Sequence, residues 1–157
     1  MDSIFKLKTP KNPLPLIFDS PHSGTDYPAD FRYACPFEEL EKAEDKYVDD
    51  LFSSVINHGG TFLCALFPRS YIDVNRAADD IDTELTGRYW PQDTHGPIHP
   101  TSRSDAGIGL IRRLVKPGMP LYNRELSPDE ILNRVYSYYI SYHNKLEQLI
   151  ENAHYNF

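Results

Sequence analysis

LPLIFDSPHSG, residues 14–24 of this chain, joins a short apolar run to a polar turn. The run at residues 14–18 ends at turn-forming residues, which predicts a buried strand. His22 then lies at the carboxyl end of that strand. Open α/β sheets bind ligands at this end, because the loops there are exposed while the strands hold them rigidly. A histidine that only caps a turn is the ordinary alternative, so the interpretation of His22 depends on the residues that accompany it.

A dense polar cluster follows the second apolar run of the chain. RSYIDVNR, residues 69–76, gathers two arginines, an aspartate and an asparagine around three apolar residues. Arginine binds a carboxylate through two parallel hydrogen bonds and stays charged throughout, so Arg69, Asn75 and Arg76 suit a dicarboxylate or a polarised carbonyl. Asp73 is placed to orient one of the arginines by a salt bridge. A surface ion-pair network is the equally favoured alternative on pattern alone.

The remaining segments predict an α/β domain with a mixed sheet flanked by helices. In chain order we expect an extended arm, a strand, a helix, two strands and a long amphipathic helix, at residues 1–13, 14–18, 37–57, 61–67, 71–75 and 127–152. Gly59 ends the first helix, and a capping box of Ser127 and Glu130 opens the last. Residues 77–119 lack periodicity, and a long irregular segment in a compact domain is more often functional than idle.

Composition narrows the class of protein. The 157 residues suit one domain, and 40% hydrophobic with 25% charged residues is typical of a soluble globular chain. A net charge of −7 without a basic patch argues against nucleic acid as a partner. The chain has no apolar run near the roughly 20 residues of a membrane span and no secretory pattern, so we expect a cytoplasmic protein without a membrane partner. Cys35 and Cys64 lack a metal-type spacing and are expected to be free thiols.

Two carboxylates border the apolar stripe of the first predicted helix. At about 100° per residue, Asp45 falls between the directions of Phe52 and Ile56, and Asp49 lies one step to the side. Burying a carboxylate is costly unless a cation compensates it, which favours a metal or an arginine partner. An exposed acidic helix is the alternative. His22 and Asp45 together supply two of the three protein ligands that a catalytic zinc site typically uses.

Several short motifs, taken in order, resemble one known family. They are PHSG at residues 21–24, Asp45 with Val48-Asp49, RSY and DVNR within residues 69–76, Gly109-Leu110, and PLY at residues 120–122. In this combination the chain is similar to the N-formylglutamate amidohydrolases, from about Leu14 to the end of the last helix. The resemblance implies a zinc-dependent deformylase of histidine degradation. It also implies a phosphorylase/hydrolase-like fold, like that of the zinc carboxypeptidases and aspartoacylases.

The resemblance also implies a role for each site residue. It assigns metal binding to His22 and Asp45, catalysis to Arg69, substrate binding to Asn75 and Arg76, and supporting roles to Asp49 and Asp73. The implied substrate is a small acidic N-acyl amino acid. Water activated by a divalent metal, zinc, attacks the formyl amide carbon and gives formate and glutamate.

The chain departs from that family in length. Family members continue, after the helix that matches residues 127–152, into a strand with another metal-binding histidine and a region with a catalytic glutamate. We therefore expect a C-terminally incomplete sheet, in a truncated chain that is complemented by a C-terminal half or a second copy, or that has lost catalysis. The competing class is a non-catalytic module in which His22, Arg69 and Arg76 bind a small acidic ligand without a metal.

Overall fold

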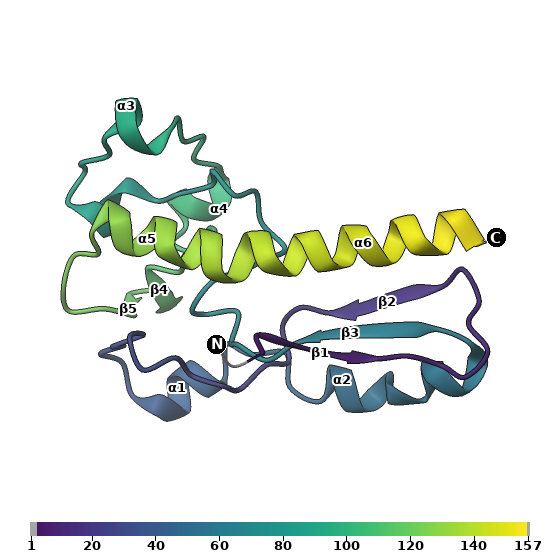
Figure 1. Ribbon diagram of the computed structural model, residues 1–157. Coiled ribbons are helices and arrows are strands. Elements are labelled where there is room, and N and C mark those ends of the chain that lie inside the picture. Colours follow the sequence, from purple (N-terminus) through teal and green to yellow (C-terminus); the bar gives the residue numbers. More distant parts are fainter. Residues whose placement is uncertain (1–2, 157) are drawn as a thin grey trace.

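A three-stranded mixed sheet carries both polar loops (Figure 1). In the computed structural model, which describes residues 3–156, β3 (Thr61–Ala65) lies in the centre of the sheet. The strand β2 (Ile17–Ser20) runs parallel to β3 on one side, and β1 (Phe5–Lys8) runs antiparallel on the other. The expected mixed sheet is confirmed, and the predicted arm at residues 1–13 contributes β1 to it.

The parallel pair brings the two polar loops to the same edge of the sheet. Ser20 at the end of β2 pairs with Cys64 near the end of β3, and parallel strands leave the sheet in the same direction. Gly24 then packs directly on the chain that follows β3. A Cβ at Gly24 would lie 2.4 Å from the carbonyl carbon of Leu66, so only glycine permits this approach. The His22 loop is thereby fixed against the loop that carries Arg69.

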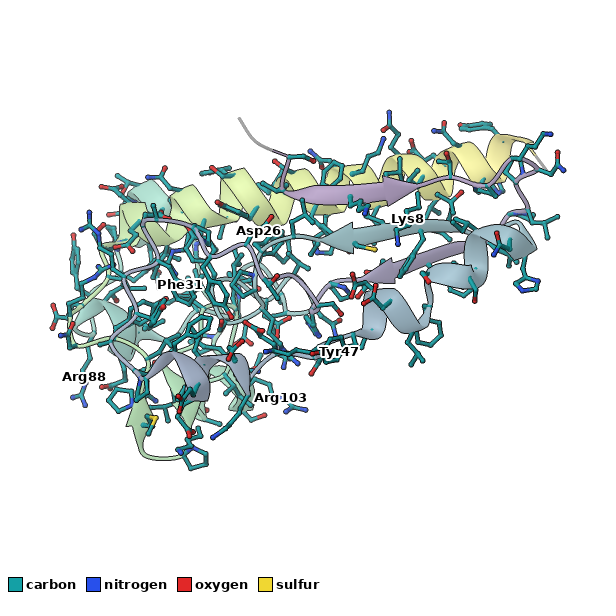
Figure 2. All side chains as sticks on the ribbon, turned by 90° about the horizontal axis from the view of Figure 1, so that it is seen from below. Lys8, Asp26, Phe31, Tyr47, Arg88 and Arg103 are labelled. Atoms are coloured by element: carbon teal, nitrogen blue, oxygen red, sulfur yellow. The ribbon has the colours of Figure 1, made fainter. Side chains whose placement is uncertain are left out.

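Helices cover both faces of the sheet, as Figures 1 and 2 show from two directions. One face is covered by α6 (Ser141–Asn156), and the other by α2 (Val48–Leu51) with the 3₁₀ helix η1 (Ser53–His58). All five residues of β3 are buried between these layers. Cys35 and Cys64 are buried free thiols. Within residues 3–156, no helix combines the length and apolar character needed to cross a membrane.

The predicted C-terminal helix is confirmed, with one irregular turn in its middle. It consists of α5 (Pro128–Arg134), the π-helical segment η3 (Val135–Ile140) and α6 in unbroken succession. The Ser127 hydroxyl accepts a hydrogen bond from the Glu130 backbone N–H at 3.1 Å, as an N-cap serine predicts. The reciprocal bond of the expected capping box is replaced, because the Glu130 carboxylate binds Arg124 and Arg134. The π-helical turn adds a residue to the helical cycle and shifts the side chains that follow it. Periodicity gave no sign of it.

The predicted helix over residues 37–57 is wrong as a single element. The chain forms α1 (Phe37–Glu41), a turn, then α2 and η1. Tyr47 has a left-handed backbone with φ of +67°, which a right-handed helix interior excludes. Asp45 lies in the turn rather than on a helix face. Its backbone carbonyl accepts a hydrogen bond from the Ser23 hydroxyl at 2.8 Å, so contacts with the β2 loop take the place of helical bonds.

The predicted strand at residues 71–75 is also absent. Turns replace it, because the Asp73 carboxylate accepts a hydrogen bond from the Asn75 backbone N–H at 3.0 Å, and the Arg76 N–H bonds to the Asp73 carbonyl at 3.1 Å. Side-chain bonds of this kind compete with strand pairing. The apolar residues of this stretch are buried in the core, and this burial produced the strand-like pattern.

Residues 77–119 are mainly irregular, as their lack of periodicity indicates. The elements in this region are short: η2 (Thr83–Thr86), α3 (Gln92–His95), α4 (Ser102–Asp105) and β4 (Leu114–Lys116), which forms a hairpin with β5 (Met119–Pro120). Hydrogen bonds from this segment to the Asp73 loop, described below, place part of it at the site.

A buried arginine ties the long helix to the loop that follows β3. Arg134 is 1% exposed, and its guanidinium donates to Glu130 Oε1 at 2.7 Å and to the Tyr122 hydroxyl at 2.8 Å. It also donates to the Tyr71 carbonyl at 3.1 Å and lies 4.1 Å from the Tyr71 ring centroid. A buried guanidinium needs such partners. Arg134 therefore fixes the loop that leads to Asp73.

The Glu130–Arg134 pair predicts a pH-dependent contribution to stability. Burial alone would raise the pKa of Glu130, but hydrogen bonds and charges of Arg124 and Arg134 lower it below its ordinary value. A carboxylate with a lowered pKa stabilises the fold at neutral pH, and this contribution is lost as the pH falls through the folded-state pKa. We expect Glu130→Gln to lower the free energy of unfolding by about 3 kcal/mol at pH 7, with a difference that shrinks toward pH 3.

Urea unfolding of both proteins across this pH range measures the effect. Glu151→Gln, a change at an exposed glutamate on α6, is the matched control and should stay within about 0.5 kcal/mol of the parent at each pH. A Glu130→Gln deficit that is the same at pH 3 and pH 7 would contradict the assignment.

Candidate functional site

Four of the predicted residues form a closed ring at the edge of the sheet. His22 lies between two carboxylates, with Nε2 2.7 Å from Asp73 Oδ1 and Nδ1 3.0 Å from Asp45 Oδ2. Arg69 joins the same two carboxylates from the other side, with Nη1 2.8 Å from Asp45 and Nη2 2.9 Å from Asp73. We call His22, Asp45, Arg69 and Asp73 the ring. Each base in it contacts both acids.

Asp73 is the buried member of the ring. Its side chain is 1% exposed, against 47% for Asp45. Burial alone would raise the pKa of Asp73, but hydrogen bonds and charges from His22 and Arg69 hold it well below its usual range. The carboxylate is therefore ionised and can only accept hydrogen bonds. Its backbone N–H bonds to the Leu110 carbonyl at 2.8 Å, which holds Asp73 against residues 108–112.

The ionised Asp73 carboxylate determines which ring nitrogen of His22 carries a proton. Because Asp73 can only accept, Nε2 is the protonated donor at 2.7 Å. In a neutral imidazole the lone pair of Nδ1 then faces the Asp45 carboxylate at 3.0 Å. Two acceptors at this distance need a positive charge between or beside them, either a proton on Nδ1 or a metal ion. Arg69 supplies part of that charge to the Asp45 oxygen.

Asn75 and Arg76 lie next to the ring, held through their backbone. The Asn75 side chain is exposed, while the Arg76 guanidinium donates to the Asn75 carbonyl at 2.9 Å and to the Ile108 carbonyl at 3.3 Å. Arg76 also lies 3.7 Å from an Asp73 oxygen. Both predicted substrate-binding residues therefore border the ring.

Two aromatic side chains of the long helix bind backbone carbonyl groups on either side of Asn75. The Tyr139 hydroxyl donates to the Arg76 carbonyl at 2.9 Å, and His143 Nε2 donates to the Val74 carbonyl at 2.8 Å. The two rings also contact each other, with centroids 4.3 Å apart. Tyr139 belongs to the π-helical segment, a feature that often occurs at functional sites. Helical spacing in the sequence gave no sign of these roles, because it does not show which side chains reach a backbone carbonyl.

The predicted supporting residue Asp49 is not part of this arrangement. It is half-buried on α2, and no hydrogen bond or ion pair joins it to the ring within residues 3–156. Glu44, which the sequence did not single out, is buried beside Asp45 instead. Both of its carboxylate oxygens lack a hydrogen-bond partner, and burial raises the pKa of Glu44 to about 7. The helical pattern gave no signal for Glu44, because it lies in the unpredicted turn.

A third arginine, Arg112, completes the charged surroundings and was missed by the sequence analysis, which stopped at Gly109-Leu110. Arg112 interacts with the charges of Arg69, Arg76, Asp73 and Asp45. Burial lowers the pKa of Arg112, and the charges of Arg69 and Arg76 lower it further, whereas those of Asp73 and Asp45 raise it. Three guanidinium groups thus surround two carboxylates. The site carries an excess of positive charge, which suits an anionic ligand.

The ring is also the place where a metal would be held. His22 Nδ1 and the Asp45 carboxylate are the candidate ligands. Within residues 3–156, no cluster of three or more histidine, cysteine, aspartate or glutamate side chains is arranged to hold an ion. The part of the chain that the structure describes therefore offers two protein ligands, and Asp73 acts behind His22 rather than beside it.

Comparisons with known proteins agree with this order of motifs. The family model of N-formylglutamate amidohydrolase matches residues 14–157. The crystal structure of N-formylglutamate amidohydrolase from Ralstonia eutropha JMP134 is 43% identical to this chain and superimposes with a TM-score of 0.90. The match covers 98% of this chain and 54% of that one, so this chain spans about half the length of the relative. The search of curated proteins found no match.

The different burial of the two carboxylates predicts unequal effects on stability. Asp73→Asn leaves the Arg69 guanidinium and the His22 ring facing a neutral buried amide, and we expect a loss of about 3 kcal/mol or more in the free energy of unfolding. Asp45→Asn affects the same two partners at a half-exposed position, where about 1 kcal/mol or less is expected. Urea denaturation at pH 7 measures both variants. Equal losses would show that burial of Asp73 does not decide the stability of the ring.

Proposed function

The chain belongs to the N-formylglutamate amidohydrolase family, and from this we propose that its site takes part in metal-dependent hydrolysis of an N-formyl amino acid. The observation that carries the proposal is the position of His22, with Nδ1 3.0 Å from the Asp45 carboxylate and Nε2 2.7 Å from the buried Asp73 carboxylate. Three arginines border this pair. A cation site next to an anion site is what hydrolysis of an acidic N-acyl amino acid requires.

The donor set fits a divalent metal. A ligating histidine typically donates its other ring N–H to a carboxylate, which fixes the tautomer and orients the ring. His22 shows this arrangement through Nε2 and Asp73. A neutral imidazole and a carboxylate are suitable ligands for zinc. The buried Asp73 would hold His22 ready, and the half-exposed Asp45 leaves the site open to solvent.

The remaining ligand is proposed to come from outside residues 3–156. A catalytic zinc site typically has three protein ligands and an open position, and the ring offers two. The relative is nearly twice as long as the part that this chain matches. We propose that a complementing C-terminal half, or a second copy in a homodimer, supplies the third ligand and the general base.

Each residue around the ring then has a defined task. A divalent metal, when bound, supplies Lewis acidity for activating water. Arg69 gives two of its five N–H groups to the ring, and its remaining N–H groups can polarise the scissile carbonyl and stabilise the charge that develops there. Asn75 and Arg76 would bind the substrate carboxylate next to the formyl amide. Tyr139 and His143 position this stretch by bonding to the carbonyl groups of Arg76 and Val74, on either side of Asn75.

Metal content is the first test of this function. We expect the completed site, in a homodimer or with the complementing C-terminal half added, to bind zinc close to stoichiometrically after dialysis against trace zinc, and His22→Ala to lower its affinity at least tenfold. Asp45→Asn should weaken zinc binding far more than Asp50→Asn, which alters an exposed aspartate on α2. His154→Ala, at an exposed histidine near the end of α6, is the histidine control. Elemental analysis and competition with a chelator measure these affinities.

The results separate the proposed function from its competitor. Zinc content unchanged by His22→Ala would contradict the metal site. Release of formate from N-formyl-L-glutamate, lost on chelation and restored by zinc, would support hydrolysis by the chain or its complemented form. A chain that binds small dicarboxylates but takes up no zinc and releases no formate would instead be a binding module, the alternative that the excess of arginine favours.

A further inference from the structure

One guanidinium at the site has no counterion of its own. Arg112 Nε is buried without a hydrogen-bond partner, and no hydrogen bond or ion pair within residues 3–156 occupies the guanidinium. Its neighbour Arg113 shows the ordinary situation, with Nε 2.6 Å from Asp82 Oδ2. Arg134 is likewise paired with Glu130. An unpaired, largely buried charge is costly, so Arg112 requires an explanation that packing does not supply.

Backbone hydrogen bonds hold residues 108–112, and with them Arg112, next to Asp73 and Arg76. The Asp73 N–H bonds to the Leu110 carbonyl at 2.8 Å, and Arg76 Nε bonds to the Ile108 carbonyl at 3.3 Å. Ile108 and Arg112 are themselves bridged as in an antiparallel pair. Residues 108–112 are thus fastened to the site at both the Asp73 and the Arg76 positions. Arg112 is held there rather than mobile in solvent.

Gly109 lets residues 108–112 pack closely against Asp80 and Ser104. A Cβ at this position would lie 2.8 Å from the Asp80 carbonyl oxygen and 2.8 Å from the Ser104 Cβ, which no other residue tolerates without displacement. The Leu110 N–H bonds to the same Asp80 carbonyl at 3.0 Å. Moving Arg112 away from the site would therefore require breaking several backbone contacts.

The other two arginines are already engaged. Arg69 is bound to both carboxylates of the ring, and Arg76 is bound to two backbone carbonyls and lies near Asp73. Of the three arginines, Arg112 alone keeps its donors free of partners within residues 3–156, although it interacts with the charges of Arg69, Arg76, Asp73 and Asp45. Arginine with free donors forms bidentate bonds with a carboxylate. A ligand carboxylate would provide both the missing counterion and the missing acceptor.

We propose that Arg112 determines substrate specificity by binding the second, side-chain carboxylate of a dicarboxylic N-acyl amino acid. This inference rests on the proposed function, which assigns the first carboxylate to Asn75 and Arg76. A monocarboxylic substrate would leave the half-buried Arg112 guanidinium without a counterion. The site therefore favours acidic over neutral side chains of the substrate.

The test compares two ligands that differ at one group. N-formyl-L-glutamate and N-formyl-L-glutamine have the same shape, but only the first carries the side-chain charge. Calorimetric titration of metal-free protein measures binding of both without hydrolysis. We expect the parent chain to prefer the glutamate compound by about tenfold or more. Arg112→Gln should reduce this preference below about threefold by weakening the glutamate compound alone.

Two further variants separate recognition from structure. Arg112→Lys keeps the charge without the planar fork, so its preference should lie between those of the parent and Arg112→Gln. Arg88→Gln is the control, because Arg88 is exposed and points outward at the end of the molecule away from the sheet (Figure 2). Thermal unfolding of Arg112→Gln should show no loss of stability, since the change removes an unpaired charge rather than a contact.

These outcomes test the role of Arg112 independently of the proposed hydrolysis. Equal weakening of both ligands by Arg112→Gln, or an unchanged preference, would overturn it. Failure of the parent chain to bind the glutamate compound would overturn it as well. A lost preference in a chain that binds no zinc and releases no formate would support the role of Arg112 while contradicting hydrolysis, because zinc content and formate release are measured independently.

Discussion

Asp73 keeps an ionised carboxylate at 1% exposure, and the site is organised around the compensation of that charge. Two loops that leave the sheet at the same edge supply the compensating groups, His22 from one and Arg69 from the other. The backbone N–H of Asn75 adds a third hydrogen bond. Because the buried carboxylate can only accept, it determines the proton position on His22. The buried Asp73 carboxylate binds Nε2 on one side of the imidazole, and this leaves Nδ1 on the other side to face Asp45.

The rigidity of this centre comes from the long C-terminal helix. Arg134 fixes the Tyr71 carbonyl, while Tyr139 and His143 fix the carbonyls of Arg76 and Val74. These contacts reach the Asp73 loop from one side, and the Leu110 carbonyl reaches it from the other. A loop with this many backbone partners presents its side chains in a defined geometry, which recognition of a small charged ligand requires.

The charge balance of the site links its two proposed tasks. Three arginines and one imidazole surround two carboxylates, so positive charge is in excess even before a cation is added at Nδ1. An anionic substrate restores the balance. The relative of known structure contains nearly twice the length of chain that matches here, and the ring supplies two of the ligands that a catalytic metal needs. The proposed substrate-binding groups are therefore more complete within residues 3–156 than the proposed metal ligands are.

Local signals in the sequence determined the parts of the fold that depend on local physics. The apolar run before His22 indicated β2, and the Ser127–Glu130 cap with its apolar spacing indicated the long helix. The sequence also placed His22 and Arg69 after apolar runs, but the parallel pairing of β2 with β3, which brings the two residues together, was decided by the tertiary structure. Tertiary structure alone decided the position of Asp45, since the left-handed backbone at Tyr47 and the bond from Ser23 interrupt the helix that periodicity predicts. It likewise decided the roles of Arg112, Tyr139 and His143. Periodicity records which residues are buried, whereas the partner of a buried polar group depends on chain segments that are distant in sequence.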